Sequence, residues 1–140
     1  MTRRHKARRW AVQILYAWET RGRDRSLRGE AEDFFTRRTI ASETREYAER
    51  LVAAIESRFD EVEALLATGA TGWDPARMSV IDRNIMRIAL AEFLAMDDVP
   101  PKVSIDEAVT LAARYGGGDS PRFVNGVLDA IAHRLDLIPS

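Results

Sequence analysis

Apolar residues recur at intervals of three and four along almost the whole chain, which is the spacing of one face of an α-helix. The clearest run consists of Tyr47, Leu51, Ile55, Phe59, Val62 and Leu66. A second run consists of Ile81, Ile85, Ile88, Ala89 and Phe93. No stretch of useful length alternates between apolar and polar residues, as a half-buried strand would. The pattern predicts an all-α fold with about seven helices, some of them short.

Three N-terminal caps are visible in the middle of the chain. Ser42 is a suitable cap for the long helix that continues to Leu66. Asp74-Pro75 is expected to restart a helix after the break that follows, because proline suits the first helical turn. Ser79, with Asp82 three residues later, resembles a capping box for the next helix.

Two more helices are expected in the last third of the chain. Ser104 and Glu107 fit a full S-x-x-E capping box, which would begin a helix that ends near Tyr115. Three glycines at 116–118 stop it, since glycine enters left-handed backbone conformations without steric cost. Ser120-Pro121 then caps and begins the last helix.

Two residues of the last helix need an explanation of their own. Gly126 lies inside a strong helical pattern, where glycine costs about 1 kcal/mol relative to alanine. Close packing against another helix is the expected compensation. Phe123 has helical spacing with core positions, yet it lies in the first turn beside Arg122, where a half-exposed ring would offer a stacking platform.

Several classes of function are excluded or disfavoured by the residues present. The absence of cysteine excludes disulfides, thiolate metal sites and thiol nucleophiles. There is no Walker-type loop and no HExxH pair, and His5 and His133 lie near opposite ends, with His5 in an arm expected to be mobile. No apolar run approaches the roughly 20 residues of a membrane span. We expect a cytoplasmic protein that is not an enzyme and needs no metal or cofactor.

Charge is distributed unevenly along the chain. Residues 1–38 contain 11 Lys/Arg and 5 Asp/Glu, a net charge of +6, whereas residues 39–140 contain 10 and 17, a net charge of −7. The basic start leads into a helix that carries Trp10, Tyr16 and Trp18. Cations beside aromatic rings suit single-stranded nucleic acid, which needs phosphate neutralisation and surfaces for stacking. On charge alone, a solvated tail is an equal alternative.

Three blocks of sequence stand out together: RRWAVQILY at 8–16, IDRNIMRIALAEF at 81–93 and VPPKVSIDEAVTLAARYGGGDSPRFVNGVLDAI at 99–131. They resemble the NusB family of bacterial transcription factors. The resemblance implies a single domain over residues 1–140, made of two small packed helical bundles with a basic arm at 1–9. It also implies processive transcription antitermination, chiefly of ribosomal RNA operons. The implied partners are boxA RNA, the ribosomal protein NusE, and elongating RNA polymerase with other Nus factors.

The resemblance further assigns residues to two adjoining surfaces by position. Its RNA-binding residues are Arg3, Arg4, Arg8, Arg9, Gln13, Arg87, Asp119, Arg122 and Phe123. Its partner-binding residues are Tyr16 and Asp82. If about five basic side chains contact phosphates, the log–log slope of affinity against salt should be about −3 to −4.

Two other functions fit the same residues. A NusB-like domain precedes the catalytic part of some rRNA cytosine methyltransferases, and this chain is then an RNA-binding part of such an enzyme. Alternatively, the chain is a helical interaction module whose basic face binds an acidic protein. The family includes monomers and homodimers, so the sequence leaves a homodimer open.

Overall fold

The computed structural model describes residues 2–69 and 78–139, which form seven helices and no strand. In chain order the helices are α1 (Arg3–Thr20), α2 (Leu27–Thr36), α3 (Ser42–Ser57), α4 (Phe59–Gly69), α5 (Val80–Ala95), α6 (Pro101–Tyr115) and α7 (Ser120–Arg134). The predicted all-α fold is confirmed. No helix in these two ranges is long and apolar enough to cross a membrane. The predicted restart at Asp74-Pro75 lies outside the described residues.

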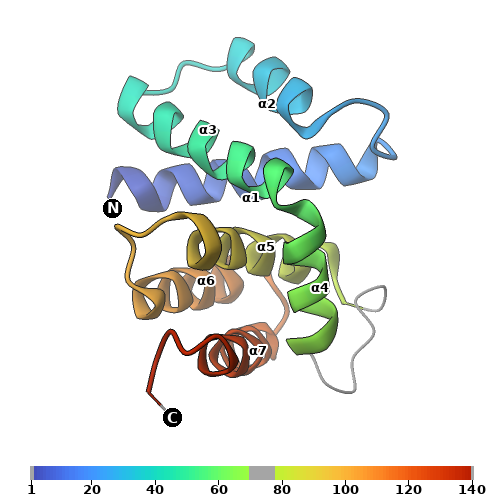
Figure 1. The fold of residues 1–140 in the computed structure, drawn as a ribbon. Helices are drawn as coiled ribbons and strands as arrows, with labels where there is room; N and C mark the ends of the chain where they lie inside the picture. The colour runs from blue at the N-terminus through green and yellow to red at the C-terminus, as the bar shows by residue number, and fades with distance from the viewer. Residues whose placement is uncertain (1, 70–77, 140) are drawn as a thin grey trace.

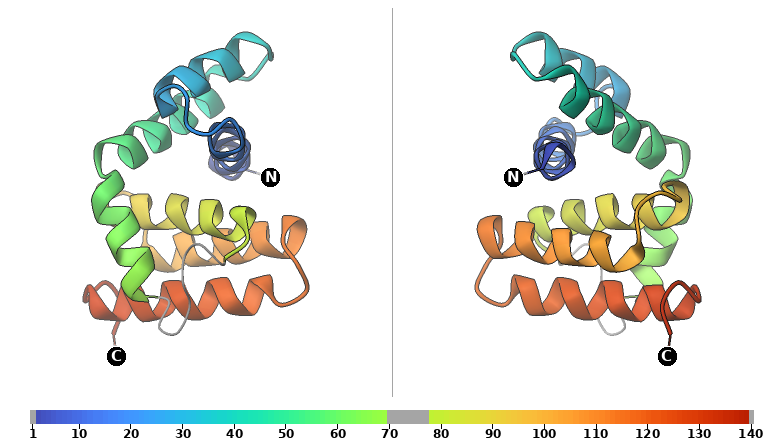
Figure 2. Two further views of the ribbon diagram at one scale, coloured as in Figure 1. Left: turned by 90° about the vertical axis from the view of Figure 1, so that its right-hand side faces the viewer. Right: turned by 90° about the vertical axis from the view of Figure 1, so that its left-hand side faces the viewer.

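The helices form two bundles that share one apolar core (Figure 1). Helices α1, α2 and α3 pack together as one bundle, and α4 to α7 form the other. Figure 2 shows α5, α6 and α7 side by side, with α1 end-on between them and the α2–α3 pair. Helix α1 contacts both α3 and α5, so its Ile14 and Leu15 are fully buried. Full burial of each such side chain stabilises the fold by about 1.5–3 kcal/mol.

The long helix predicted from Ser42 to Leu66 is divided into α3 and α4. Arg58 leaves the helical conformation with φ −117° and ψ 27°, while its N–H still donates to the carbonyl of Ala54. The turn gives α4 a new direction along the second bundle (Figure 1). Neither glycine nor proline lies at the break, and the apolar spacing runs through it. Ser42 is also the first helical residue and not the cap, which is Ala41 without a side-chain bond.

Helix α6 begins four residues earlier than predicted, with Pro100 and not Ser104 at the N-cap position. Pro101 occupies its first turn, where a fixed φ and a missing N–H have no cost. Ser104 is therefore inside the helix, buried, and its hydroxyl has no hydrogen-bond partner among the described residues. Glu107 pairs with His5 of α1 and does not cap. This ion pair also corrects the expectation of a mobile His5, which is helical and buried.

Gly116 and Gly126 have structural roles that differ from the predicted ones. Helix α6 does end at Tyr115, but Gly116 has an extended backbone with φ −91° and not a left-handed one. Its missing side chain matters because a Cβ would lie 2.5 Å from Cβ and Oγ of Ser120. Gly126 is exposed, and apart from its chain neighbours and the nearby backbone of its own helix, no described atom lies within 4 Å of the place its Cβ would occupy. The predicted close helix packing at Gly126 is therefore wrong.

Candidate nucleic-acid interface

One face of α1 carries a row of exposed polar and aromatic residues. The helix begins at Arg3, where the Thr2 hydroxyl accepts the N–H of His5 at 3.1 Å, so most of the expected arm 1–9 is helical. Lys6, Arg9, Gln13 and Tyr16 follow at intervals of three, four and three, which places them on one face. We call these four residues the α1 stripe. Arg9 is half-buried and the others are exposed.

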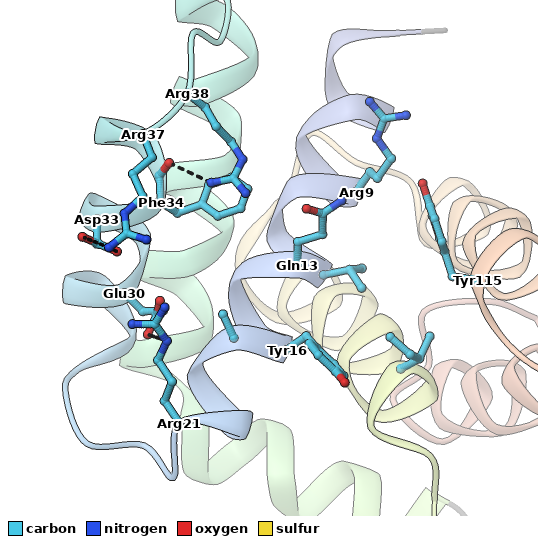
Figure 3. Close-up of a pocket in the computed structure, with 13 residues that line it drawn as sticks. Arg9, Gln13, Tyr16, Arg21, Glu30, Asp33, Phe34, Arg37, Arg38 and Tyr115 are labelled. Atoms are coloured by element: carbon cyan, nitrogen blue, oxygen red, sulfur yellow. Dashed lines mark hydrogen bonds and ion pairs between the residues drawn. The ribbon is translucent and has the colours of Figure 1, made fainter.

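Three residues of the α1 stripe, Arg9, Gln13 and Tyr16, line a groove of about 320 Å³ between the two bundles (Figure 3). The groove is lined by Arg9, Val12, Gln13, Tyr16, Ala17, Arg21, Glu30, Asp33, Phe34, Arg37, Arg38, Ile81 and Tyr115. Tyr16 and Tyr115 are the most exposed aromatic side chains described, at 46% and 38%. In Figure 3, Tyr115 lies on one side of α1, and Arg37 and Arg38, which directly follow α2, lie on the other.

The turn that follows α2 contributes two cations to the groove, Arg37 and Arg38, which the sequence did not single out. Arg38 donates from Nη1 to the carbonyl of Phe34 at 3.3 Å, and its guanidinium lies 3.7 Å from the centre of that ring. Arg37 pairs with Asp33 at 3.1 Å. Both arginines are exposed. The only signal for them was the net positive charge of residues 1–38.

The first two arginines of α1 do not line the groove and are held in ion pairs elsewhere. Arg3 pairs with Glu43 of α3. Arg4 bonds Asp98 at 2.7 Å and stacks 4.5 Å from the centre of the Tyr47 ring. This hydrogen bond from Arg4 holds the pKa of the Asp98 carboxyl below its usual value. The structure therefore separates Arg3 and Arg4 from the groove.

Arg8 is 3% exposed, so a direct contact with RNA does not fit its position. Its Nε donates to Oε2 of the buried Glu92 at 2.7 Å, and the Tyr47 hydroxyl donates to the same oxygen at 2.6 Å. Burial and the Glu92 charge both raise the pKa of Tyr47, which keeps the hydroxyl protonated as a donor. The group ties α1, α3 and α5 together, which is a structural role.

Arg87 is likewise interior, at 1% exposed. Its Nε donates to Glu63 of α4 at 2.6 Å, its Nη1 donates to Asn84 at 2.8 Å, and it pairs with Glu19 of α1. Burial opposes the charge on Glu19, but hydrogen bonds and charge from Arg87 and Arg83 still lower the pKa of that carboxyl. The expected RNA contact is thus replaced by a bridge between the two bundles.

The turn between α6 and α7 brings the remaining predicted residues together. We call residues 116–123 the α6–α7 corner. Asp119 and Arg122 are exposed, and Phe123 is half-buried. Tyr115, which immediately precedes the corner, lines the groove with Gln13, whereas residues 116–123 themselves are not among the residues that line it. Asp82, expected to contact a partner, is buried at 7% and accepts a hydrogen bond from Ser120.

The described residues contain no group of three or more His, Cys, Asp or Glu side chains that could hold a metal ion. The fold and the groove define a two-bundle all-α protein with cations and aromatic rings along the junction of its bundles.

The chain belongs to the NusB family, whose model matches residues 5–133. It is 38% identical over 128 residues to a transcription antitermination protein NusB of Chloroherpeton thalassium, covering 91% of this chain and 60% of that protein. It is 41% identical to the protein of that name in Salinispora tropica, covering 94% and 96%. These relatives are named as transcription factors and not as enzymes, in agreement with the sequence prediction.

Solved structures have the same fold. A T. maritima NusB structure superposes with a TM-score of 0.85 at 34% identity, covering 95% of this chain and 92% of the other. A structure described as antitermination factors NusB and NusE in complex with dsRNA gives 0.80 at 26% identity, covering 96% and 98%. The predicted two-bundle NusB-like fold is confirmed.

Proposed function

We propose that this protein is a transcription antitermination factor that binds boxA-type single-stranded RNA together with NusE in the cytoplasm. In this role it supports processive transcription of ribosomal RNA operons with RNA polymerase and other Nus factors. The names of its relatives support antitermination, and the relative crystallised with NusE and RNA supports both partners. The observation that carries the proposal is that Arg9, Gln13 and Tyr16 of the α1 stripe line the same groove as Tyr115.

The RNA surface in this proposal runs from the start of the α1 stripe to the α6–α7 corner. Lys6, Arg9 and Arg122 supply positive charge for phosphates, and Gln13 can donate to and accept from a base edge. Tyr115 and Phe123 offer ring surface for unstacked bases. With Arg8 and Arg87 buried, about three to four phosphate contacts remain. The expected log–log salt slope is then about −2 to −3 for a single strand.

The protein partner in this proposal occupies the part of the groove between α1 and α2. Val12 of α1 and Phe34 of α2 line it with apolar atoms, and Tyr16 stands exposed at its edge. An exposed aromatic ring beside apolar side chains and a few arginines is typical of a protein interface. NusE bound there would lie next to the RNA surface, since Gln13 and Tyr16 are neighbours on one helix face.

A binding titration tests the proposal. Labelled boxA RNA and a scrambled RNA are titrated with the protein, with and without NusE, at two salt concentrations. We expect tighter binding of boxA, a further gain with NusE, and a several-fold loss for Arg9→Ala. Arg45→Ala is the matched control, because Arg45 pairs with Glu49 on α3, away from the groove. Equal binding of both RNAs in all conditions would contradict the proposal.

The two other functions are separated from this proposal by two different observations. The relatives above are named antitermination proteins, which favours that role over the RNA-binding part of a methyltransferase. A module that binds only an acidic protein would retain its partner in the presence of RNA. We also propose that self-association, if present, covers the α1 stripe, so RNA should shift sedimentation towards a monomer.

A further inference from the structure

Asp82 is a buried residue, 7% exposed, so its carboxylate is not accessible to a binding partner on the surface. Its backbone N–H donates to the Ser79 hydroxyl at 3.1 Å, which confirms Ser79 as the N-cap of α5. Its Oδ2 accepts a hydrogen bond from the Ser120 hydroxyl at 3.0 Å. Its Oδ1 is buried with no hydrogen-bond partner among the described residues. A carboxylate held this way is costly to bury, so its single bond to Ser120 is of structural consequence.

Ser120 extends this bond to the backbone of the α6–α7 corner. Its hydroxyl also accepts the N–H of Gly117 at 2.9 Å, while its own N–H donates to the Gly117 carbonyl at 3.1 Å. The hydroxyl approaches this closely because Gly116 has no Cβ, which would lie 2.5 Å from it. One buried hydroxyl therefore connects the turn to the first turn of α5.

The connected segment carries the side chains proposed to contact RNA. Asp119 precedes Ser120, and Arg122 and Phe123 follow it within the first turn of α7. Tyr115 ends α6 on the other side of the turn. Recognition by a few side chains depends on their relative position, so a turn that moves by an ångström loses contacts without unfolding.

From this arrangement we propose that Asp82 is a positioning residue for RNA binding: through Ser120 it fixes the α6–α7 corner in its RNA-binding conformation, and it does not act as a contact for the protein partner. The proposal rests on the proposed function, because it assumes that the corner binds RNA. It assigns Ser120 and Gly116 to the same task, although neither is expected to touch RNA.

The test compares three variants in two separate titrations, one with boxA RNA alone and one with NusE alone. Ser120→Ala removes both hydroxyl bonds without changing charge, and Asp82→Ala removes the acceptor. Asp82→Asn retains an oxygen that can accept from Ser120. We expect RNA affinity to fall about five- to tenfold in Ser120→Ala and Asp82→Ala, and to be retained in Asp82→Asn. A double variant that combines Ser120→Ala with Asp82→Ala should lose no more RNA affinity than either single variant.

NusE affinity should stay within twofold of wild type in Ser120→Ala and Asp82→Asn. Circular dichroism establishes that each variant is folded, and Ser120→Ala alone is sufficient if Asp82→Ala fails to fold. If wild type prefers boxA but Ser120→Ala binds it equally well, the positioning role is overturned. It is also overturned if Asp82→Asn weakens NusE binding while Ser120→Ala does not. If wild type shows no preference for boxA over the scrambled RNA in the titration that tests the proposed function, the proposed function itself fails.

Discussion

Adjacent arginines on α1 should respond in opposite ways to the same substitution. Arg8 is 3% exposed and donates to the buried Glu92 at 2.7 Å, whereas Arg9 is half-buried beside the groove. Arg8→Met keeps the aliphatic stem but leaves Glu92 with only the Tyr47 hydroxyl. Removing one member of a buried pair costs about 3–5 kcal/mol. Because the Tyr47 bond at 2.6 Å remains, we expect a loss of about 3 kcal/mol.

Urea unfolding followed by circular dichroism measures this loss directly. At about 2.1 cal/mol/K per residue, a chain of 140 residues has an unfolding entropy near 0.3 kcal/mol/K, so Tm should fall by about 10 °C. Arg9→Met is the matched control: it gives up a cation–π contact 5.1 Å from the Trp10 ring, worth about 1 kcal/mol or less. Adding Glu92→Gln to Arg8→Met should restore most of the stability, since the amide still accepts from Tyr47.

The RNA titration should show the reverse order. Arg9→Met is expected to weaken boxA binding several-fold, and folded Arg8→Met should bind nearly as wild type. A stability loss below 1 kcal/mol for Arg8→Met would refute the reasoning. So would a folded Arg8→Met that loses as much RNA affinity as Arg9→Met, because the buried Arg8 would then be an RNA contact.

Three further outcomes follow from the structure. Gly126→Ala should raise Tm by about 2–3 °C in a thermal melt, because replacing an exposed helical glycine by alanine, where the new Cβ has room, stabilises the fold by about 0.5–1 kcal/mol. In the same assay Gly69→Ala should lower Tm, since its Cβ would overlap the Ile131 side chain. The lowered pKa of Glu19 contributes stability that is present above its ordinary value of about 4.5 and lost as pH falls below it, so Glu19→Gln should flatten the acid side of the stability curve. Tyr115→Ala should weaken boxA binding about tenfold through lost stacking and change Tm little, because the ring is 38% exposed.

Helix content was predictable because apolar spacing reports a buried face directly. The spacing does not report backbone direction, so the division at Arg58 could not be found from the run of Tyr47 to Leu66. The capping motif at Ser104 was misleading for a related reason. A proline three residues earlier can begin a helix without a side-chain cap, and local motifs do not reveal which start prevails.

The site was harder to predict because a basic run says nothing about which cations reach solvent. On one helix, successive residues point in directions about 100° apart, so Arg8 faces the core and Arg9 faces the groove. The resemblance assigned both to RNA. Arg37 and Arg38 join the groove only because α2 folds back over α1, a tertiary contact with no local signature.

Mapping the amide chemical-shift changes of the isotope-labelled protein on addition of boxA RNA tests the central claim most directly. The account predicts that the changes concentrate at residues 6–16 and 114–123, on the side of the groove. Changes confined to the opposite side of α1, around Arg4, Glu43 and Asp98, would contradict it.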